Sequence, residues 1–304
     1  MSFDTVPPEA HPSITADAVL ELVRTQAPEF AWLELGGRSE GWDCANYRLG
    51  EELMVRLPRT EHAVKFLLAE TAWVPILGAE WDFPHPVFPF LGEPGAGYPW
   101  PWAIVSWVPG DMAVDVPLAS SEGAALGRAL AQVHQPAPPD APLNDEQSIP
   151  MAEREERTLR RIAALADAGG PNGERLDAGA AREVWAAASA VPDPRRDQWV
   201  WSHADLHGAN VLSLGGRFGG IVDWGSMAAC DPAVDLGFAH SLTTADGVAA
   251  MLAEYGALTG RVDDALEARM RGIGLAKSVG IAMSDTPATK AMGWRGLDAL
   301  GLVR

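Results

Sequence analysis

Residues 201–235, WSHADLHGANVLSLGGRFGGIVDWGSMAACDPAVD, are the segment that decides the fold. His203, Asp205 and His207 alternate in it, so their side chains share one face if this stretch is extended. The letters VLSL, a glycine-rich turn and GGIVD follow, which is the pattern of a β-hairpin. We therefore expect a polar loop that leads directly into a hairpin.

The two ends of this hairpin carry oxygen-bearing side chains. Asn210 precedes its first strand, and Asp223 follows its second. Because a hairpin returns the chain close to its start, we expect both to lie near Asp205. One carboxamide and two carboxylates suit Mg²⁺, which takes oxygen ligands and completes its shell with substrate phosphates. His203 and His207 leave a second interpretation open, a zinc or iron site.

The balance of charge restricts the partners. The chain has 304 residues and a formal net charge of −18. This length suits one large domain or two lobes that share a cleft. The negative charge repels phosphate backbones, so nucleic acid and anionic membranes are poor partners, whereas a cationic organic substrate would be attracted. Of the 23 basic residues only three are lysines, so most sites that need a cation will use arginine.

Several features favour the cytoplasm. The two cysteines, Cys44 and Cys230, cannot build a disulfide framework. Residues 1–13, MSFDTVPPEAHPS, are acidic and proline-rich and do not resemble a signal peptide. No run of about 18 apolar residues predicts a membrane span.

The first third of the chain is rich in short strands. An antiparallel meander is expected at residues 31–35, 46–49 and 53–57, separated by Gly36-Gly37, Gly41 and Gly50-Glu51, and a further strand is expected at 102–108. Helical periodicity marks residues 15–26 and 61–77. The last strand stops at Pro109-Gly110, a pair that suits a hinge.

Beyond this hinge helices dominate. Helices are expected at residues 121–135, 151–168 and 178–190 and from about 248 to the end, with short strands at 199–202, 211–214 and 220–222. The expected fold class is α+β, with a small N-terminal lobe at residues 1–108 and a larger, mainly helical lobe at 109–304. No Gly-x-x-x-x-Gly-Lys-Ser/Thr run occurs, which excludes a P-loop enzyme.

Two of these stretches resemble the aminoglycoside phosphotransferase family, protein-kinase-like kinases of small molecules that include macrolide phosphotransferases. HADLHGANVL is similar to the family's His-x-Asp-Leu-His-x-x-Asn loop, and IVDWGSMAACDPAVDLG is similar to its metal-binding stretch. The resemblance extends to SEGWDCANYRLGEELMVRLPR, PWAIVSWVPG and LGRALAQVH, and it weakens at residues 136–195 and after about 245. It implies a protein-kinase-like fold of two lobes.

The resemblance also implies roles for the residues of the polar loop and hairpin. Asp205 would be the catalytic base, or the residue that orients the attacking hydroxyl. Asn210 and Asp223 would bind Mg²⁺. His203 would support the loop, and Asp235 would tie the loop backbone to a following helix.

Further residues fall at the nucleotide-binding positions of the family. Arg56 stands where kinases place the lysine that grips the phosphates, and Glu70 stands where the ion-pair partner of that lysine belongs. Arginine keeps the charge but is bulkier and donates in a planar fork. Backbone groups of Ser106 and Val108 would bind the base of ATP or GTP. Ser39 would lie in the loop between the first two strands and cover the phosphates.

The acceptor is not fixed by the sequence. The resemblance implies a kinase of an antibiotic-like substrate, an aminoglycoside or a macrolide, and hence antibiotic resistance. A housekeeping acceptor such as choline or homoserine is an alternative. So is a nucleotide-binding protein with little catalysis, which only Arg56 suggests. The choice between ATP and GTP and the oligomeric state also stay open.

Overall fold

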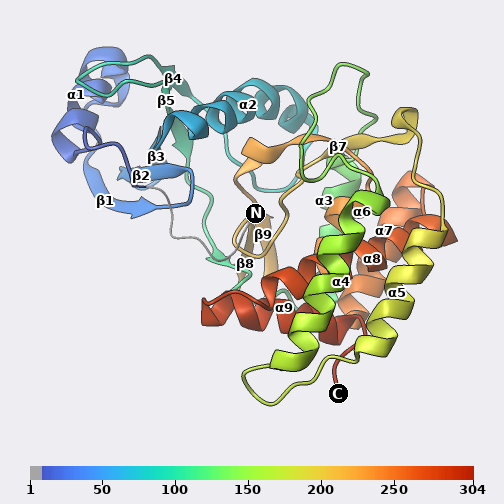
Figure 1. Cartoon of the computed structure of the whole chain (residues 1–304). Coiled ribbons are helices and arrows are strands. Elements are labelled where there is room, and N and C mark those ends of the chain that lie inside the picture. Colours follow the sequence, from blue (N-terminus) through green and yellow to red (C-terminus); the bar gives the residue numbers. More distant parts are fainter. Residues whose placement is uncertain (1–8) are drawn as a thin grey trace.

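The computed structural model describes residues 9–304, so the first eight residues of the acidic, proline-rich start lie outside the described residues. The chain folds into a small lobe around an antiparallel sheet and a larger, mostly helical lobe (Figure 1), which confirms the expected fold class. The small lobe contains α1 (Ala16–Gln26), β1 (Leu35–Glu40), β2 (Cys44–Leu49), β3 (Leu53–Pro58), α2 (Glu61–Leu77), β4 (Phe90–Gly92) and β5 (Trp102–Ser106). The large lobe contains β6 (Asp111–Met112), α3 (Gly123–Val133), α4 (Met151–Ala168), α5 (Ala178–Ala190), β7 (Val200–Ser202), β8 (Val211–Leu214), β9 (Arg217–Ile221), β10 (Ala228–Cys230), α6 (Ala233–Leu242), α7 (Ala245–Thr259), α8 (Asp264–Ile281) and α9 (Pro287–Ala299).

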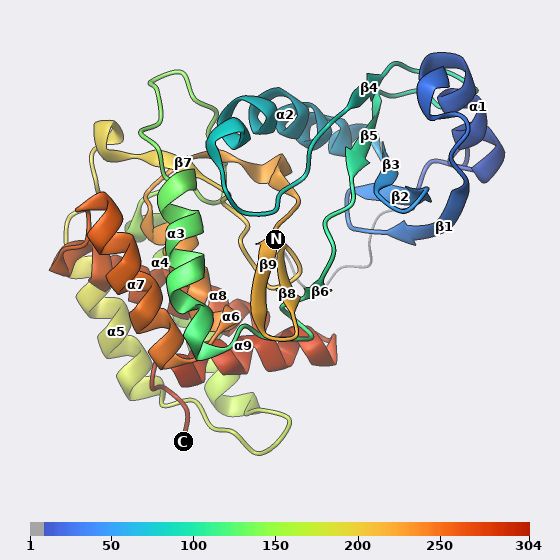
Figure 2. The same ribbon diagram turned by 180° about the vertical axis from the view of Figure 1, so that it is seen from behind.

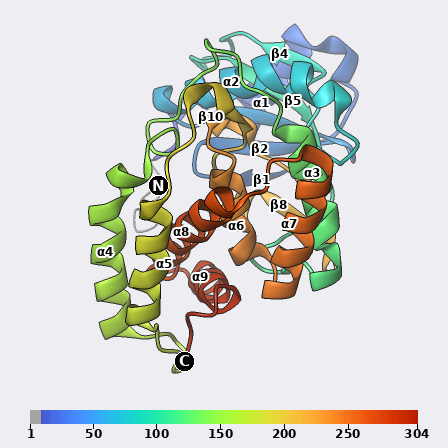
Figure 3. The same ribbon diagram turned by 90° about the vertical axis from the view of Figure 1, so that its right-hand side faces the viewer.

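The small lobe is built on a five-stranded sheet in the order β1-β2-β3-β5-β4, and every pair is antiparallel. β2 and β3 form a hairpin whose turn is made by Gly50 with φ +61°, a conformation that favours glycine. Figure 3 shows this lobe above the helical one. Its own core consists of apolar side chains from α1 and the sheet, among them Leu22, Leu49, Val55, Leu57, Trp102 and Ile104.

The strand expected at residues 31–35 is wrong. Residues 31–34 form a turn, and the strand lies at Leu35–Glu40 instead. The pair Gly36-Gly37 predicted a break, yet it lies inside β1, where the register with β2 is irregular. A Cβ at Gly36 would lie 3.0 Å from the Cβ of Arg48, so glycine allows the close cross-strand approach. As a result Ser39 is a residue of the strand and not of the loop that follows.

Helix α2 connects the two lobes. Thr60 caps it by accepting from the Ala63 N–H, and Leu67 is buried on it. Val74, near its C-terminus, packs into the core of the large lobe. In Figure 1 the helix runs from the sheet across to the helical lobe, where it meets the short helical turn Trp224–Ser226.

The chain enters the large lobe directly after β5. Pro109-Gly110 follows the strand, and β6 then pairs with β8. The expected hairpin is confirmed: β8 and β9 pair antiparallel around Gly215-Gly216, both with positive φ. The division of the chain at residues 108 and 109 stays a prediction.

Helices α3 to α9 pack on one another to form the bulk of the large lobe. In Figure 2, α3 and α7 lie side by side, and glycine makes this contact close, because a Cβ at Gly127 would lie 2.4 Å from the Met251 carbonyl oxygen. The sequence pattern did not predict helix α6 or the strand β4, and only the family resemblance implied a helix next to Asp235. All ten residues of α6 are buried, so it has no polar face to reveal a helical period. Among residues 9–304, no helix combines the length and apolar composition needed to cross a membrane.

Candidate active site

The loop that carries Asp205 is fixed by one buried carboxylate. Asp235, in the first turn of α6, accepts from the backbone N–H of His203 at 2.7 Å and of Ala204 at 2.9 Å. These bonds hold Ala204 at φ +66°, a conformation that costs free energy for a residue other than glycine. Burial opposes ionisation of Asp235, but the hydrogen bond and charge of His134 help to hold its pKa below the usual value.

The ring of His203 links the loop to the end of β9. Its Nδ1 accepts from the Asp205 N–H at 3.2 Å, so Nε2 carries the proton and donates to the Val222 carbonyl oxygen at 3.0 Å. Both ring nitrogens are therefore engaged, which removes the zinc or iron interpretation of this histidine. Among the described residues, no group of three or more His, Cys, Asp and Glu side chains could hold a metal ion.

Asn210 closes the loop from its other end. Its side-chain nitrogen Nδ2 donates to the Asp205 backbone carbonyl oxygen at 2.8 Å. The backbone carbonyl oxygen of Asn210 accepts from the Val222 N–H at 2.9 Å. Because the amide nitrogen is committed to the loop, the oxygen Oδ1 is the atom left for a ligand. Asp205 is half-buried, and its Oδ2 lies 3.6 Å from Nε2 of His207.

Arg56 stands between two carboxylates that come from different lobes. Its Nη1 lies 2.7 Å from Glu70 of α2, and its Nη2 lies 2.5 Å from Asp223 at the end of the hairpin. Glu70 also accepts from the Trp224 N–H at 3.0 Å. The side chain of Glu70 is 0% exposed, that of Arg56 8% and that of Asp223 45%. Glu70 is thus fully buried, Arg56 keeps a small exposed part, and Asp223 still faces solvent.

The local charges keep Asp223 ionised. Burial opposes ionisation, but the charge and hydrogen bond of Arg56 outweigh it and lower the pKa of Asp223. Its backbone lies in the left-handed region at φ +64°, which turns the chain away from the hairpin at this residue. The Asp223 carboxylate and the Asn210 side-chain oxygen are hard donors, and the hydrogen bond from the Val222 N–H to the Asn210 backbone carbonyl joins the chain at Asn210 to the residue before Asp223. Such donors fit Mg²⁺ whose remaining ligands come from phosphates.

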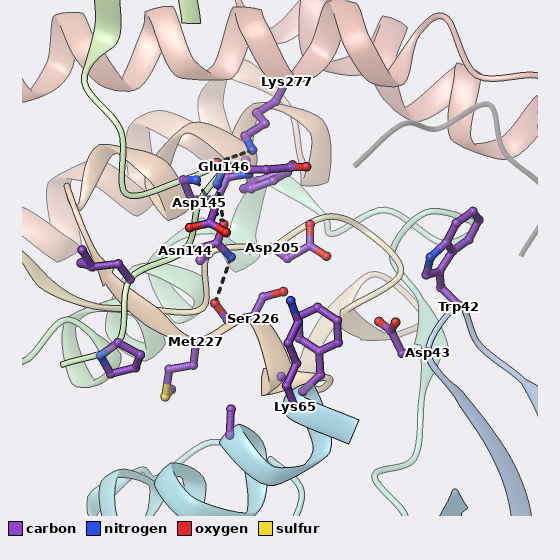
Figure 4. Close-up of a pocket in the computed structure, with 18 of the residues that line it drawn as sticks. Trp42, Asp43, Lys65, Asn144, Asp145, Glu146, Asp205, Ser226, Met227 and Lys277 are labelled. Atoms are coloured by element: carbon purple, nitrogen blue, oxygen red, sulfur yellow. Dashed lines mark hydrogen bonds between the residues drawn. The ribbon is translucent and has the colours of Figure 1, made fainter. Parts of the chain in front are cut away.

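A pocket of about 530 Å³ opens beside Asp205. Figure 4 shows Asp205 facing this space, with Trp42 and Asp43 from the small lobe on one side and Lys277 from α8 on another. Burial and the nearby charge of Asp223 raise the pKa of Asp43 to about 6. Sequence reasoning missed these lining residues. One signal was present: Lys277 is a rare lysine inside an apolar stretch, GIGLAKSVGI.

The residues expected to bind nucleotide are not all brought together. Ser39 is exposed on β1, pairs with Asn46 and does not line the pocket. The Ser106 N–H donates to the Val87 carbonyl oxygen, so only its carbonyl could face a base. The N–H of Val108 has no hydrogen-bond partner within residues 9–304, which leaves it available to a ligand.

Comparisons with solved structures agree with this geometry. The macrolide 2'-phosphotransferase of Brachybacterium faecium, solved without ligand, is 22% identical; the match covers 92% of this chain and 97% of that one, with a TM-score of 0.59. The GDP complex of aminoglycoside 2'-phosphotransferase-IIIa is 16% identical, with coverage of 93% and 96% and a TM-score of 0.59. Macrolide 2'-phosphotransferase type I is also 16% identical, with coverage of 95% and 98% and a TM-score of 0.59. These likenesses establish the fold.

Sequence comparisons supply the family. No curated protein matches this chain. The model of the phosphotransferase enzyme family, APH, matches residues 34–273, which include the whole loop and hairpin described above. The chain belongs to the phosphotransferase enzyme family.

Proposed function

We propose that this enzyme transfers the γ-phosphoryl group of ATP or GTP to a hydroxyl of a small molecule in the cleft between its lobes. The observation that carries the proposal is the placement of Asp205. It lies on a loop held by Asp235 and Asn210, and it faces a pocket large enough for a small molecule. Phosphoryl transfer needs mainly positioning and charge neutralisation, together with a carboxylate that orients the hydroxyl.

Each residue then has a defined task. The Asp205 carboxylate accepts the hydrogen bond of the acceptor hydroxyl and takes up its proton. Asn210 and Asp223 hold Mg²⁺, which when bound neutralises the charge of the transferred phosphoryl group. Arg56 donates to the phosphates while Glu70 keeps it oriented. Val108 offers its free N–H to the base.

Two classes of acceptor are candidates. Structurally similar enzymes act on macrolides and aminoglycosides, so antibiotics of these kinds, and a role in resistance, are the first candidates. A hydroxylated metabolite is the second candidate. The lysine and arginine side chains that line the pocket favour a metabolite with a negative charge over these antibiotics. The intact trio of Asp205, Asn210 and Asp223 speaks against a protein that only binds nucleotide. We place the enzyme in the cytoplasm, where its two buried, unpaired cysteines stay reduced.

The test is a panel of antibiotics and metabolites incubated with Mg-ATP or Mg-GTP and read by mass spectrometry for an added phosphate. Asp205→Asn should reduce turnover by about 10²–10⁴-fold, the usual contribution of a positioned base. Nucleotide binding should persist in this variant. Asp197→Asn, at an exposed carboxylate outside the pocket, is the matched control and should keep full turnover. Turnover of Asp205→Asn above a tenth of the wild-type rate would refute the assignment.

A further inference from the structure

The pocket beside Asp205 differs in charge from the rest of the molecule. The chain as a whole has 41 acidic and 23 basic residues. Five of the pocket's lining residues are Lys or Arg, and four are Asp or Glu. Two of those acidic residues, Asp145 and Glu146, are exposed. We call Arg154, Arg157 and Lys277 of this lining the basic wall. Their clustering needs an explanation, because like charges gathered in a partly buried space repel one another.

Two cations of this wall share a single neutral acceptor. Nζ of Lys277 on α8 lies 2.6 Å from Oε1 of Gln147, and Nη1 of Arg154 on α4 lies 3.4 Å from the same oxygen. The other hydrogen bonds of the buried Arg154 go to backbone carbonyl oxygens of residues 146–149. Its Nε is buried without a partner. Within the described chain, neither Arg154 nor Lys277 forms an ion pair.

A third cation extends the wall toward the opening. Arg157 lies one turn after Arg154 on α4, is half-buried and lines the same pocket. It makes no hydrogen bond or ion pair with residues 9–304. Arg160 on the same helix is different, because it points outward and pairs with Glu156 at 3.6 Å. Arg157 therefore lines the pocket without a partner among the described residues, whereas Arg160 lies outside the pocket and is paired.

We propose that Lys277 and Arg157, backed by Arg154, bind an anionic group of the acceptor, a carboxylate or a phosphate, and so place its hydroxyl against Asp205. The proposal rests on the proposed function, since it names the class of acceptor. Figure 4 shows Lys277 reaching from α8 into the space that Asp205 faces. Arginine supplies a fork that matches the two oxygens of a carboxylate, and lysine supplies a point charge. The acceptor is then a hydroxylated acid or a phosphate ester and not a polycation.

The state of Lys277 agrees with this assignment. Burial and the charge of Arg154 lower the pKa of Lys277 to about 7. An anion in contact with the amine would favour its charged form and offset the repulsion by Arg154.

The first test needs no catalysis and uses two aldehydes that differ in charge. Pyridoxal 5'-phosphate and pyridoxal each condense with a lysine amine, with loss of water, and borohydride reduces the imine by delivering hydride to its carbon. The chain has three lysines, so peptide mapping assigns every label. We expect the ratio of labelling at Lys277 to that at Lys290 to be at least about 10-fold higher for the anionic aldehyde. Lys290 lies on α9 outside the pocket and is the internal reference.

Two arginine variants decide whether the wall as a whole attracts the anion. Arg157→Gln should reduce this selectivity several-fold, and Arg160→Gln, at the outward residue of the same helix, should leave it unchanged. Equal labelling ratios for the two aldehydes would overturn the proposal. Equal effects of the two arginine variants would also overturn it, since the overall positive charge of α4, and not the residues that line the pocket, would then explain the selectivity.

The second test separates this proposal from the proposed function. In the acceptor panel, we expect the compounds that become phosphorylated to carry a carboxylate or a phosphate already. Pairs of a hydroxy acid and its neutral amide show whether a carboxylate supplies the charge. Transfer to neutral or cationic acceptors only would overturn the anionic class while leaving the kinase assignment intact. Selective labelling at Lys277 without any phosphoryl transfer or Mg-dependent nucleotide hydrolysis would instead refute the kinase. Loss of that selectivity in the presence of a saturating non-hydrolysable Mg-ATP analogue would show that the wall binds nucleotide, which also overturns the proposal.

Discussion

At the scale of single residues, Arg56 is one of the groups that join the two lobes, because it pairs with Glu70 of α2 and with Asp223 of the large lobe. Removing its charge leaves Glu70 buried and uncompensated, which typically costs about 3–5 kcal/mol. We expect Arg56→Met to lower the free energy of unfolding by about 3 kcal/mol in urea titrations. Arg56→Lys should lose less, because lysine keeps the charge but cannot fork between Glu70 and Asp223. Arg38→Met is the control, since Arg38 forms a half-exposed pair with Glu40 and should change stability by less than about 1 kcal/mol.

A second residue, Asp43, should make stability depend on pH. Its pKa of about 6 in the folded protein exceeds the usual value of 3.8 for an aspartate, because of burial and the charge of Asp223. Between these pH values the folded state holds a proton that the unfolded state has released, so stability falls as pH rises through about 6. Asp43→Asn should therefore be more stable than wild type by about 1–2 kcal/mol at pH 7.5, after allowance for solvent screening. The two proteins should be equally stable near pH 3.5. A gap of the same size at both pH values would contradict this account.

The same residues show what the sequence could and could not predict. Asp205, Asn210 and Asp223 lie close together in the sequence, so their spacing and the expected hairpin predicted that they share one site. The contact between Arg56 and Asp223 joins positions 167 residues apart, and no local pattern encodes it. Lys277 lines the pocket from an apolar helix without a motif, so only its rarity marked it. Functional residues that lie in one segment can be predicted from the sequence, whereas a site assembled from distant segments depends on tertiary packing.

At the scale of elements, α6 determines the position of the loop that carries Asp205. Asp235 in its first turn accepts two backbone hydrogen bonds from the loop, and an asparagine could accept only one of them. Asp235→Asn should lower kcat for phosphoryl transfer about 10-fold or more, with little change in the KM for nucleotide. It should also lower the free energy of unfolding by about 2 kcal/mol. Asp264→Asn changes an exposed first-turn acid of α8 and should do neither. A change in nucleotide KM alone would argue against a role in positioning the loop.

The predicted elements failed where burial or glycine disguised their period. The hairpin of residues 211–221 was foreseen, because its strands alternate around two glycines that make the turn. Periodicity missed helix α6, which only the family resemblance implied, since burial on all sides leaves no polar stripe. The first strand was misplaced, because Gly36-Gly37 was interpreted as a break although the sheet uses it for a close approach to Arg48. Tertiary packing decided both cases.

At the scale of the whole molecule, the two lobes have separate hydrophobic cores and are joined by α2, which packs against residues 224–226, and by the Arg56–Asp223 ion pair. A ligand that binds groups of both lobes should therefore stabilise the folded protein as a unit. At a nucleotide concentration of about 100 Kd the gain is about 2.7 kcal/mol, which corresponds to a rise in Tm of roughly 5–10 °C for a chain of this size. We expect this rise with Mg-ATP or Mg-GTP in thermal unfolding.

Magnesium removal tests whether this stabilisation passes through the proposed metal ligands. Excess EDTA should abolish most of the nucleotide-dependent rise in Tm, because the phosphates then lose their link to Asn210 and Asp223. Asp223→Asn should give a smaller rise even with saturating Mg²⁺, since it removes the ionised ligand and frees Arg56 from its partner in the large lobe. Asp197→Asn, far from the cleft, should behave like wild type in both conditions. A rise in Tm that is indifferent to both EDTA and Asp223→Asn would mean that nucleotide binds without bridging the two lobes at this site.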